Sequence, residues 1–235
     1  MQIFPASPQA ITYAIAILKL GGVVAHATET CYGLACDMTN PQAVEKLFRI
    51  KQRKPSQPVS ALFPSIVASR EWVEWCEEAL TLAKKELPGP LTIVLPAKKE
   101  KLNMIYTAPK WKVEQPSPRL RPSRSGKWKM IGIRVSSHPV AMELAKFFGK
   151  PISTTSANVS GNQPTYSVQN IIDQFQQPNV KTCKRENLKT CCQEVHAFPL
   201  ISEPDLIIDS GELEKRPPSR VIIFENGKVK TLRAA

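Results

Sequence analysis

Short apolar runs that alternate with helical segments constrain the fold of this 235-residue chain more than any other feature of its sequence. Residues 23–27 and 91–96 are runs of β-branched and other apolar residues that are typical of buried strands. Between them, residues 41–51 follow Asn40 and begin with Pro41, the pattern of an N-cap and the first helical position. The chain therefore predicts an α/β fold, in which helices cover the faces of a sheet.

The same alternation continues to the end of the chain. Further helices are predicted over residues 8–20, 65–87 (one helix or two), 139–148 and 165–175. Further strands are predicted over residues 58–63, 131–135, 151–155, 205–209, 219–224 and 228–233. The Asn-Gly pair at 226–227 indicates a closing hairpin. No internal repeat or linker interrupts the pattern, so we predict a single domain over residues 1–235, with a twisted mixed sheet flanked by helices.

The sequence shows no signal for a membrane span or for secretion. No apolar run reaches the roughly 18 to 20 residues that a spanning helix needs, and no basic residue precedes the apolar stretch at 11–18. The six cysteines include no CxxC pair, which is typical of reduced thiols. Cys183, Cys191, Cys192 and His196 lack the spacing of paired zinc ligands, so incidental thiols are favoured over a metal site. We expect a cytoplasmic protein without metal-binding side chains.

Positive charge is concentrated in one segment. Residues 98–129 hold ten lysines and arginines against two glutamates, which gives +8 of the formal net charge of +12. Four prolines in the same stretch predict an extended basic loop inserted in the domain. Two interpretations stay open: a solvated loop, or a contact for a polyanion such as tRNA or nucleotide phosphates.

Polar clusters follow several of the predicted strands, whereas the common nucleotide and hydrolase motifs are missing. The chain contains no P-loop, no GxGxxG after a strand, no GxSxG and no HExxH. The clusters are 28–30, 153–158 and 219–220, and strand ends of open α/β sheets commonly hold ligands. Each cluster alone could also be a turn, an N-cap or a solvated helix end. Positive charge that suits phosphate or carboxylate comes from Lys51, Arg53 and Arg134.

Taken together, the motifs resemble those of the YrdC/TsaC proteins, which make L-threonylcarbamoyladenylate. The motifs that carry the likeness, in chain order, are TETCYGL (28–34), KQR (51–53), PGPLT (88–92), IGIRVSSHP (131–139), SANVSG (156–161) and LR (232–233). The likeness runs from about Ile11 to Arg233. It implies a short, single-domain form with a basic concave cleft on an open mixed sheet.

The resemblance also implies roles for individual residues. L-Threonine would be bound by Thr30, Arg134, Ser156 and Ser219. ATP would be bound by Lys51, Arg53, Gln57, Asn158, Thr165 and Arg233. Lys51 and Arg53 would meet the ATP phosphates at the rim of the cleft and would be the catalytic pair.

The reaction implied is the conversion of L-threonine, bicarbonate and ATP, with Mg²⁺, into threonylcarbamoyl-AMP and pyrophosphate. A carbamate of the threonine amine would attack the α-phosphorus, so catalysis would rest on positioning and charge neutralisation. A partner transferase complex would then use the product to modify tRNA. We expect no membrane partner, and a monomer or a weak dimer.

The sequence departs from the family pattern at several points. The usual PTET is ATET here, Leu62 stands where some members have a polar residue, Arg220 replaces the common threonine, and the chain ends in LRAA. Two alternatives stay open. One is a non-catalytic RNA-binding module of the same fold, supported by Trp111 and Trp128 among the basic residues. The other is a carbamoyl-adenylate former, as in the YrdC-like module of hydrogenase maturation proteins.

Overall fold

The computed structural model describes residues 1–54, 57–106, 129–176, 203–225 and 228–235. Its helices are α1 (Pro8–Lys19), α2 (Pro41–Ile50), α3 (Ile66–Ser69), α4 (Glu77–Glu86), α5 (Pro139–Phe148) and α6 (Val168–Phe175), with one 3₁₀ turn at Lys99–Lys101. Its strands are β1 (Gln2–Pro5), β2 (Val24–Ala27), β3 (Tyr32–Ala35), β4 (Ser60–Leu62), β5 (Leu91–Pro96), β6 (Met130–Arg134), β7 (Ile152–Ser156), β8 (Leu206–Asp209), β9 (Arg220–Glu225) and β10 (Lys228–Arg233).

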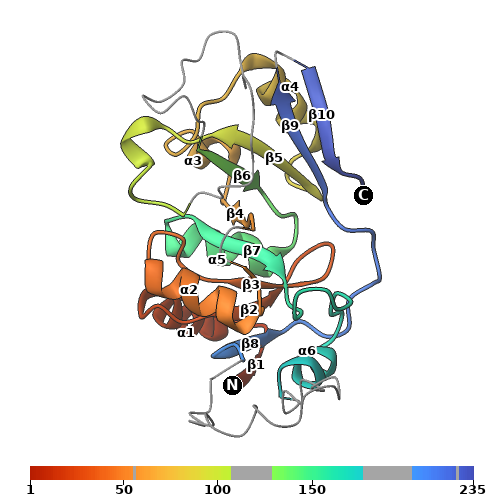
Figure 1. Cartoon of the computed structure of the whole chain (residues 1–235). Coiled ribbons are helices and arrows are strands. Elements are labelled where there is room, and N and C mark those ends of the chain that lie inside the picture. The colour runs from red at the N-terminus through yellow and green to blue at the C-terminus, as the bar shows by residue number, and fades with distance from the viewer. Residues whose placement is uncertain (55–56, 107–128, 177–202, 226–227) are drawn as a thin grey trace, which may run out of the picture.

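The described strands form one ten-stranded mixed sheet in the order β1-β8-β2-β3-β7-β4-β6-β5-β9-β10. The pairs β1–β8, β2–β8, β4–β6 and β5–β9 are parallel, and the other neighbours are antiparallel. Strand β7 pairs with β3 on one side and with β4 on the other, so it joins the two halves of the sheet (Figure 1). The predicted α/β class and the twisted mixed sheet are confirmed.

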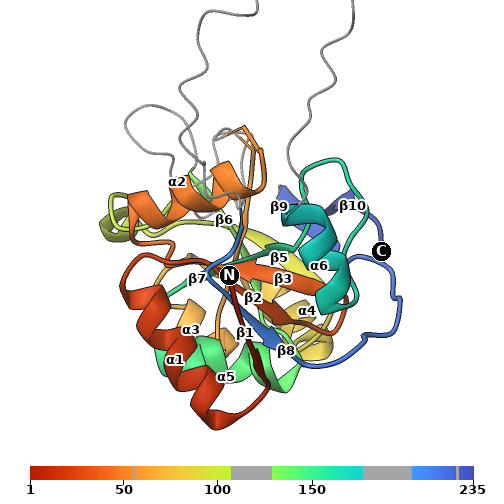
Figure 2. The same ribbon diagram turned by 90° about the horizontal axis from the view of Figure 1, so that it is seen from below.

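Helices cover both faces of the β1–β7 half (Figure 2). One core cluster holds Leu206 and Ile208 of β8 with side chains of α1 and α5. The intervening Ile207 packs instead with side chains of α2 and α6. Because successive side chains of a strand point to opposite faces, this alternation places the two helix pairs on opposite sides of the sheet.

Local sequence signals fix where the helices begin and end. The side chains of Ser7, Asn40, Ser65 and Ser167 accept hydrogen bonds from backbone N–H groups in the first turns of α1, α2, α3 and α6. Gly149 ends α5 with a φ of 75°, which a residue without a Cβ adopts at little cost.

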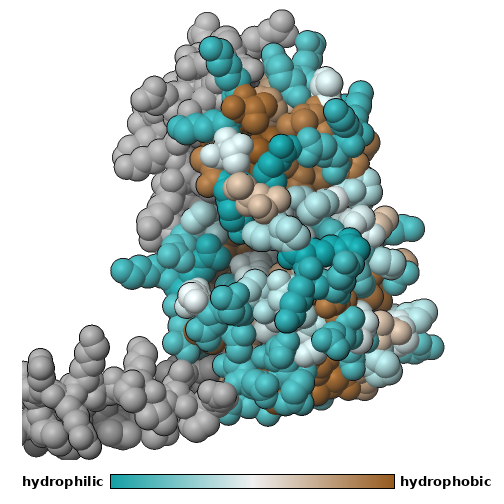
Figure 3. Space-filling view, turned by 90° about the vertical axis from the view of Figure 1, so that its right-hand side faces the viewer, coloured by the Kyte–Doolittle hydropathy of each residue, from teal (hydrophilic) through white to brown (hydrophobic). Residues whose placement is uncertain are grey.

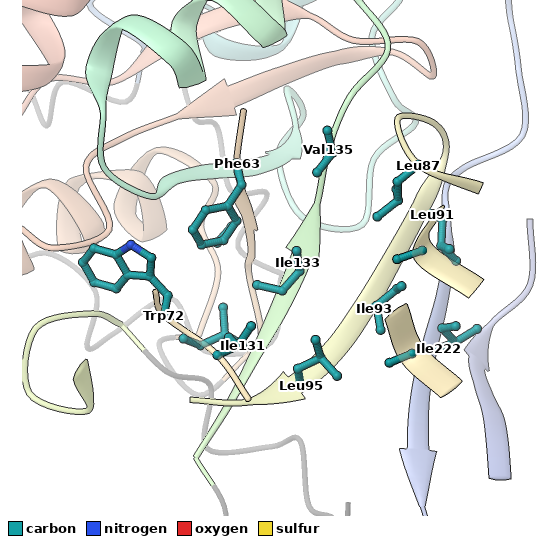
Figure 4. Close-up of a cluster of buried hydrophobic side chains, with 14 of the residues drawn as sticks. Phe63, Trp72, Leu87, Leu91, Ile93, Leu95, Ile131, Ile133, Val135 and Ile222 are labelled. Atoms are coloured by element: carbon teal, nitrogen blue, oxygen red, sulfur yellow. The ribbon is translucent and has the colours of Figure 1, made fainter. Parts of the chain in front are cut away.

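The β5–β6–β9 half packs its larger core cluster with side chains of α3 and α4 on one face, and a small cluster of Val94, Met130 and Ile223 lies on the other. Ile93 and Leu95 of β5 pack with Ile131 and Ile133 of β6 in the cluster that also holds Trp72 (Figure 4). Their neighbours along the strands, among them Arg134, point to the opposite face, where α3 and α4 do not lie. The face opposite α3 and α4 carries the candidate site.

Two strands were missing from the sequence prediction. Strand β1 is only four residues long and lies at the edge of the sheet, and β3 overlaps the TETCYGL motif, which the sequence indicates as a polar cluster or, alternatively, a turn. The predicted closing hairpin is confirmed by the antiparallel pairing of β9 with β10, although its turn at 226–227 lies outside the described residues.

Some predictions concern parts of the chain outside this description. Residues 107–128, which form most of the predicted basic loop, are not described, nor is the cysteine-rich stretch from Cys183 to His196. The extent of the domain also stays a prediction. Within the described ranges, no helix has both the length and the apolar character needed to cross a membrane.

Candidate functional site

A cleft of about 590 Å³ opens on the face opposite α3 and α4, over the junction of the two halves of the sheet. It is lined by the ends of β4, β5, β6 and β7, by the segment before β9 and by the end of β10. The polar lining residues are Thr30, Cys31, Arg53, Ser60, Thr92, Arg134, Thr154, Thr155, Ser156, Gln163, Tyr166, Arg216, Ser219 and Arg233. Hydrophilic residues likewise run across the middle of the face shown in Figure 3.

Strand pleating brings Thr92 and Arg134 into this cleft. The two residues are cross-strand partners on β5 and β6, and the flanking Ile93 and Ile133 point into the core on the other side. The sequence therefore aims a hydroxyl and a guanidinium at the cleft by simple alternation along two apolar strands.

Arg134 is the centre of a buried polar cluster, which we call the Arg134 cluster: Glu29, Thr30, Arg134 and Ser136. The Arg134 Nη2 donates to Glu29 Oε1 at 2.9 Å and to Thr30 Oγ1 at 2.9 Å, and the Ser136 hydroxyl donates to Glu29 Oε2. The side chains of Arg134 and Glu29 are 9% and 7% exposed. The Nε of Arg134 is buried without a partner in this structure.

Charge pairing outweighs burial at Glu29. Burial alone raises the pKa of its carboxyl, but the Arg134 guanidinium and the bond from Ser136 bring that pKa below its ordinary value. Glu29 therefore stays ionised and compensates the charge of Arg134 inside the protein.

Arg53 and Arg233, which we call the open arginine pair, donate to neutral acceptors among the residues that the structure describes. Arg53 donates to Pro58 O at 2.7 Å, to Gln57 Oε1 at 2.8 Å and to Thr155 Oγ1 at 3.3 Å. Arg233 donates to the carbonyl oxygen of Ser219 at 2.7 and 3.0 Å and to its hydroxyl at 2.9 Å. Burial lowers the pKa of both guanidiniums. These hydrogen bonds hold the two groups in place without neutralising them.

Lys51 lies beneath the cleft, and the expectation that it lies at the rim is wrong. Its side chain leaves the C-terminal end of α2, the residue is 2% exposed, and it is not among the lining residues. The Nζ donates to Ser156 O at 2.5 Å, to Asn158 O at 2.9 Å and to Asn158 Oδ1 at 3.3 Å. Burial, and then the charge of Arg53, lowers the pKa of Lys51 to about 7. Contact with phosphate stays a prediction.

The SAN motif forms a tight turn at the end of β7, which side-chain hydrogen bonds within the motif and from Thr165 stabilise. The Ser156 hydroxyl donates to Asn158 Oδ1 at 2.5 Å, and the Asn158 amide donates to Val159 O and Asn162 O. The buried Thr165 hydroxyl donates to Ala157 O at 2.9 Å. Asn158 and Thr165 therefore shape the floor of the cleft, and their predicted contacts with nucleotide stay predictions.

The structure thus brings six of the predicted site residues to the surface of one cleft and places the other four beneath or beside it. The six are Thr30, Arg53, Arg134, Ser156, Ser219 and Arg233, and the four are Lys51, Gln57, Asn158 and Thr165. Sequence analysis missed Arg216 and Tyr166 among the lining residues. Arg216 could have been found as a basic residue in the polar stretch directly before Ser219.

No side-chain metal site is evident in the described ranges. No group of three or more His, Cys, Asp and Glu side chains there could hold a metal ion. The described cleft lining likewise contains no Asp or Glu. Carboxylates are the ligands that Mg²⁺ most often takes from proteins, so a magnesium ion in this cleft would be held by its ligand's phosphates and by water.

An open mixed sheet with a cleft of hydroxyls and arginines defines an α/β protein of the kind that holds small anionic ligands at strand ends. A family model, Sua5_yciO_yrdC, described as telomere recombination, matches residues 16–183. The chain belongs to this family.

Several similar proteins are known. The chain is 32% identical over 165 residues to the threonylcarbamoyl-AMP synthase of Photobacterium profundum, an alignment that covers 68% of this chain and 78% of the relative. It superposes on P. abyssi Sua5 complexed with L-threonine at a TM-score of 0.71 and 25% identity, over 99% of this chain and 56% of that one. E. coli YciO shares the fold, with a TM-score of 0.70 at 24% identity over 99% of this chain and 94% of YciO.

Proposed function

We propose that this protein makes threonylcarbamoyl-AMP and pyrophosphate from L-threonine, bicarbonate and ATP, as a nucleotidyltransferase. One observation carries the proposal: a single cleft holds one arginine compensated by a buried glutamate and two arginines whose partners, within the described ranges, are neutral acceptors. The first arrangement suits a zwitterionic amino acid, and the second suits a polyphosphate. The synthase relative and the threonine-bound relative support the same assignment.

The threonine would lie beside the Arg134 cluster. The buried Nε of Arg134 lacks a partner and suits a carboxylate oxygen. The Thr30 and Ser156 hydroxyls line the same cleft and would read the hydroxyl of the substrate. Ser219, held by Arg233, would complete this part of the site.

The nucleotide would lie along the open arginine pair. The threonine amine would attack bicarbonate to give a carbamate and water, and a carbamate oxygen would then attack the α-phosphorus with pyrophosphate leaving. Arg53 and Arg233 would neutralise the phosphates, and Lys51 would hold the turn from Ser156 to Asn158 under the nucleotide. Bound Mg²⁺ would supply further charge neutralisation on the phosphates. No protein nucleophile is needed for this sequence of steps.

Threonine-dependent release of pyrophosphate tests the proposal. Purified protein with ATP, Mg²⁺ and bicarbonate should release pyrophosphate when L-threonine is added. Valine, which lacks the hydroxyl, should be much poorer, because a site that hydrogen-bonds a hydroxyl discriminates strongly against its absence. Equal rates with valine and threonine would contradict the roles of Thr30 and Ser156.

The proposal also covers the partner, the location and the oligomeric state of the protein. The product would pass to a transferase complex that modifies tRNA, and the protein would act in the cytoplasm as a monomer or weak dimer. Binding of tRNA without any threonine-dependent pyrophosphate release would instead support the non-catalytic RNA-binding alternative.

A further inference from the structure

A ten-residue strap at 210–219 links β8 to β9 and so passes from one half of the sheet to the other (Figure 1). Its residues Arg216, Pro218 and Ser219 line the cleft. Its first part is tied down by the Tyr32 hydroxyl, which donates to Gly211 O at 2.8 Å, and by Leu213 N, which donates to Tyr166 O at 2.8 Å. Its last residue, Ser219, is held by Arg233. Both ends of the strap are therefore anchored to the walls of the cleft.

Arg216 is the arginine that this strap brings into the cleft lining. Its Nε and Nη2 both donate to Glu214 Oε2, at 3.0 and 2.7 Å. The side chains of Arg216 and Glu214 are 55% and 72% exposed, and such exposed pairs contribute little to stability because water screens them. Pro217 restricts the backbone of Arg216 to extended conformations, so the side chain can change partner while the backbone stays in place.

We propose that Arg216 is a further phosphate-binding residue. Its side chain would break its ion pair with Glu214 and bind the terminal phosphates of a nucleoside triphosphate in the cleft. This inference rests on the proposed function. A triphosphate carries about four negative charges near neutral pH, whereas the open arginine pair supplies two positive ones, so a third guanidinium improves the match. Glu214 then acts as a competing anion that the phosphates displace.

The position of Arg216 also predicts which part of the ligand its side chain binds. Arg216 comes from the middle of the strap, whereas Arg53 donates to Thr155 of β7 and Arg233 of β10 donates to Ser219 at the end of the strap. The Arg216 side chain is 55% exposed, so Arg216 contributes a solvent-accessible part of the cleft lining. The terminal phosphates, which extend furthest from the nucleoside, are the groups that it can reach.

The experiment compares the binding of ATP, AMP and inorganic tripolyphosphate to three variants of the full chain by calorimetry. Arg216→Ala should weaken ATP and tripolyphosphate about tenfold, the size expected for one charge-assisted hydrogen bond, and should leave AMP unchanged. Glu214→Gln should strengthen both polyphosphates a few-fold, because the competing anion is removed. Arg49→Ala is the matched control: Arg49 is 50% exposed, pairs with Glu45 on α2 and is not among the cleft-lining residues.

The outcomes separate this inference from the proposed function. If the unaltered protein releases pyrophosphate with threonine but Arg216→Ala binds ATP normally, the inference is overturned and the proposed function stands. If the unaltered protein binds ATP without threonine-dependent release and Arg216→Ala weakens ATP and tripolyphosphate but not AMP, the inference stands and the proposed function fails. An equal loss in Arg216→Ala for ATP and AMP would also overturn the inference, since it would indicate a general loss of structure.

Discussion

In the Arg134 cluster a guanidinium faces a buried carboxylate, whereas the open arginine pair faces only carbonyl, amide and hydroxyl oxygens. Both regions line one cleft and both hold their guanidiniums with several hydrogen bonds. They differ in net charge: near zero in the first region, and +2 in the second.

This difference in net charge predicts that the first region contributes mainly to the stability of the fold and the second mainly to ligand binding. A buried ion pair loses much stability when one partner is removed, because the other charge stays buried and uncompensated. A guanidinium bound to neutral groups at a cleft wall keeps its charge available for a ligand. We therefore expect mutations in the Arg134 cluster to change folding first, and mutations of the open arginine pair to change ligand affinity first.

The largest effect should come from Glu29→Gln. The substitution keeps the shape of the side chain but leaves the charge of Arg134 uncompensated, so the free energy of unfolding should fall by roughly 3 to 5 kcal/mol. Urea denaturation measures it. Glu214→Gln removes a carboxylate from an exposed arginine pair and should change stability by less than about 1 kcal/mol. Equal losses in the two variants would remove the distinction between the regions.

The second effect is on the pH dependence of folding stability. His26 is fully buried near the Arg134 cluster, and burial lowers its pKa from 6.5 to about 4. The unfolded chain takes up a proton near pH 6.5 and the folded protein only near pH 4, so stability should fall as the pH drops through that window. The loss should reach about 3 kcal/mol. His26→Gln should flatten the stability profile between pH 6.5 and 4, and an unchanged profile would contradict the assignment to His26.

The third prediction compares the loss of an arginine from each of the two regions. Arg53→Met should weaken ATP by roughly 1.5 to 3 kcal/mol, as expected for loss of a charged hydrogen bond, with little loss of stability because its partners in the protein are neutral. Arg134→Met should do the opposite and destabilise the fold, since it leaves Glu29 buried without its partner. Calorimetry and thermal denaturation on both variants measure the two effects. Equal destabilisation by the two substitutions would contradict the comparison.

The smallest effect concerns the orientation of Arg53. The Tyr106 hydroxyl donates to Gln57 O at 3.1 Å, and the Gln57 side chain accepts from Arg53 Nε. Tyr106→Phe keeps the ring against Phe48 and should weaken ATP by about 1 kcal/mol, the value of one ordinary hydrogen bond. The KM for ATP should rise while kcat and the KM for threonine stay the same. A fall in kcat would show a broader structural role for Tyr106.

Sequence patterns predicted most helices and strands because their apolar residues repeat with a regular period. Strand β3 escaped prediction because Gly33 and polar neighbours conceal it. In the structure, a Cβ at Gly33 would lie 3.3 Å from Thr155 O, so glycine allows a close approach of β3 to its partner β7. Only the paired strand reveals that close approach.

The site was predictable as a set of motifs, but not as an arrangement of charges. Lys51 and Arg53 stand two residues apart in a basic run that suggests solvent exposure, yet one is buried under the SAN turn and the other lines the cleft. The pairing of Arg134 with Glu29 joins residues from β6 and from the segment after β2. Spacing along the chain carries no information about such contacts.

Strand β2 pairs in parallel with β8, which pairs in turn with β1, so Val24 and Gln2 both lie opposite Leu206. On a ribosome, β1 and β2 are made first, and β2 has one edge unpaired until residues near 206 have been added. At ordinary rates of synthesis that delay is roughly 10 to 30 s. Pairing between such distant segments also slows folding after release. During that interval the nascent chain exposes a buried-type apolar strand edge, which is the kind of segment that chaperones shield from aggregation.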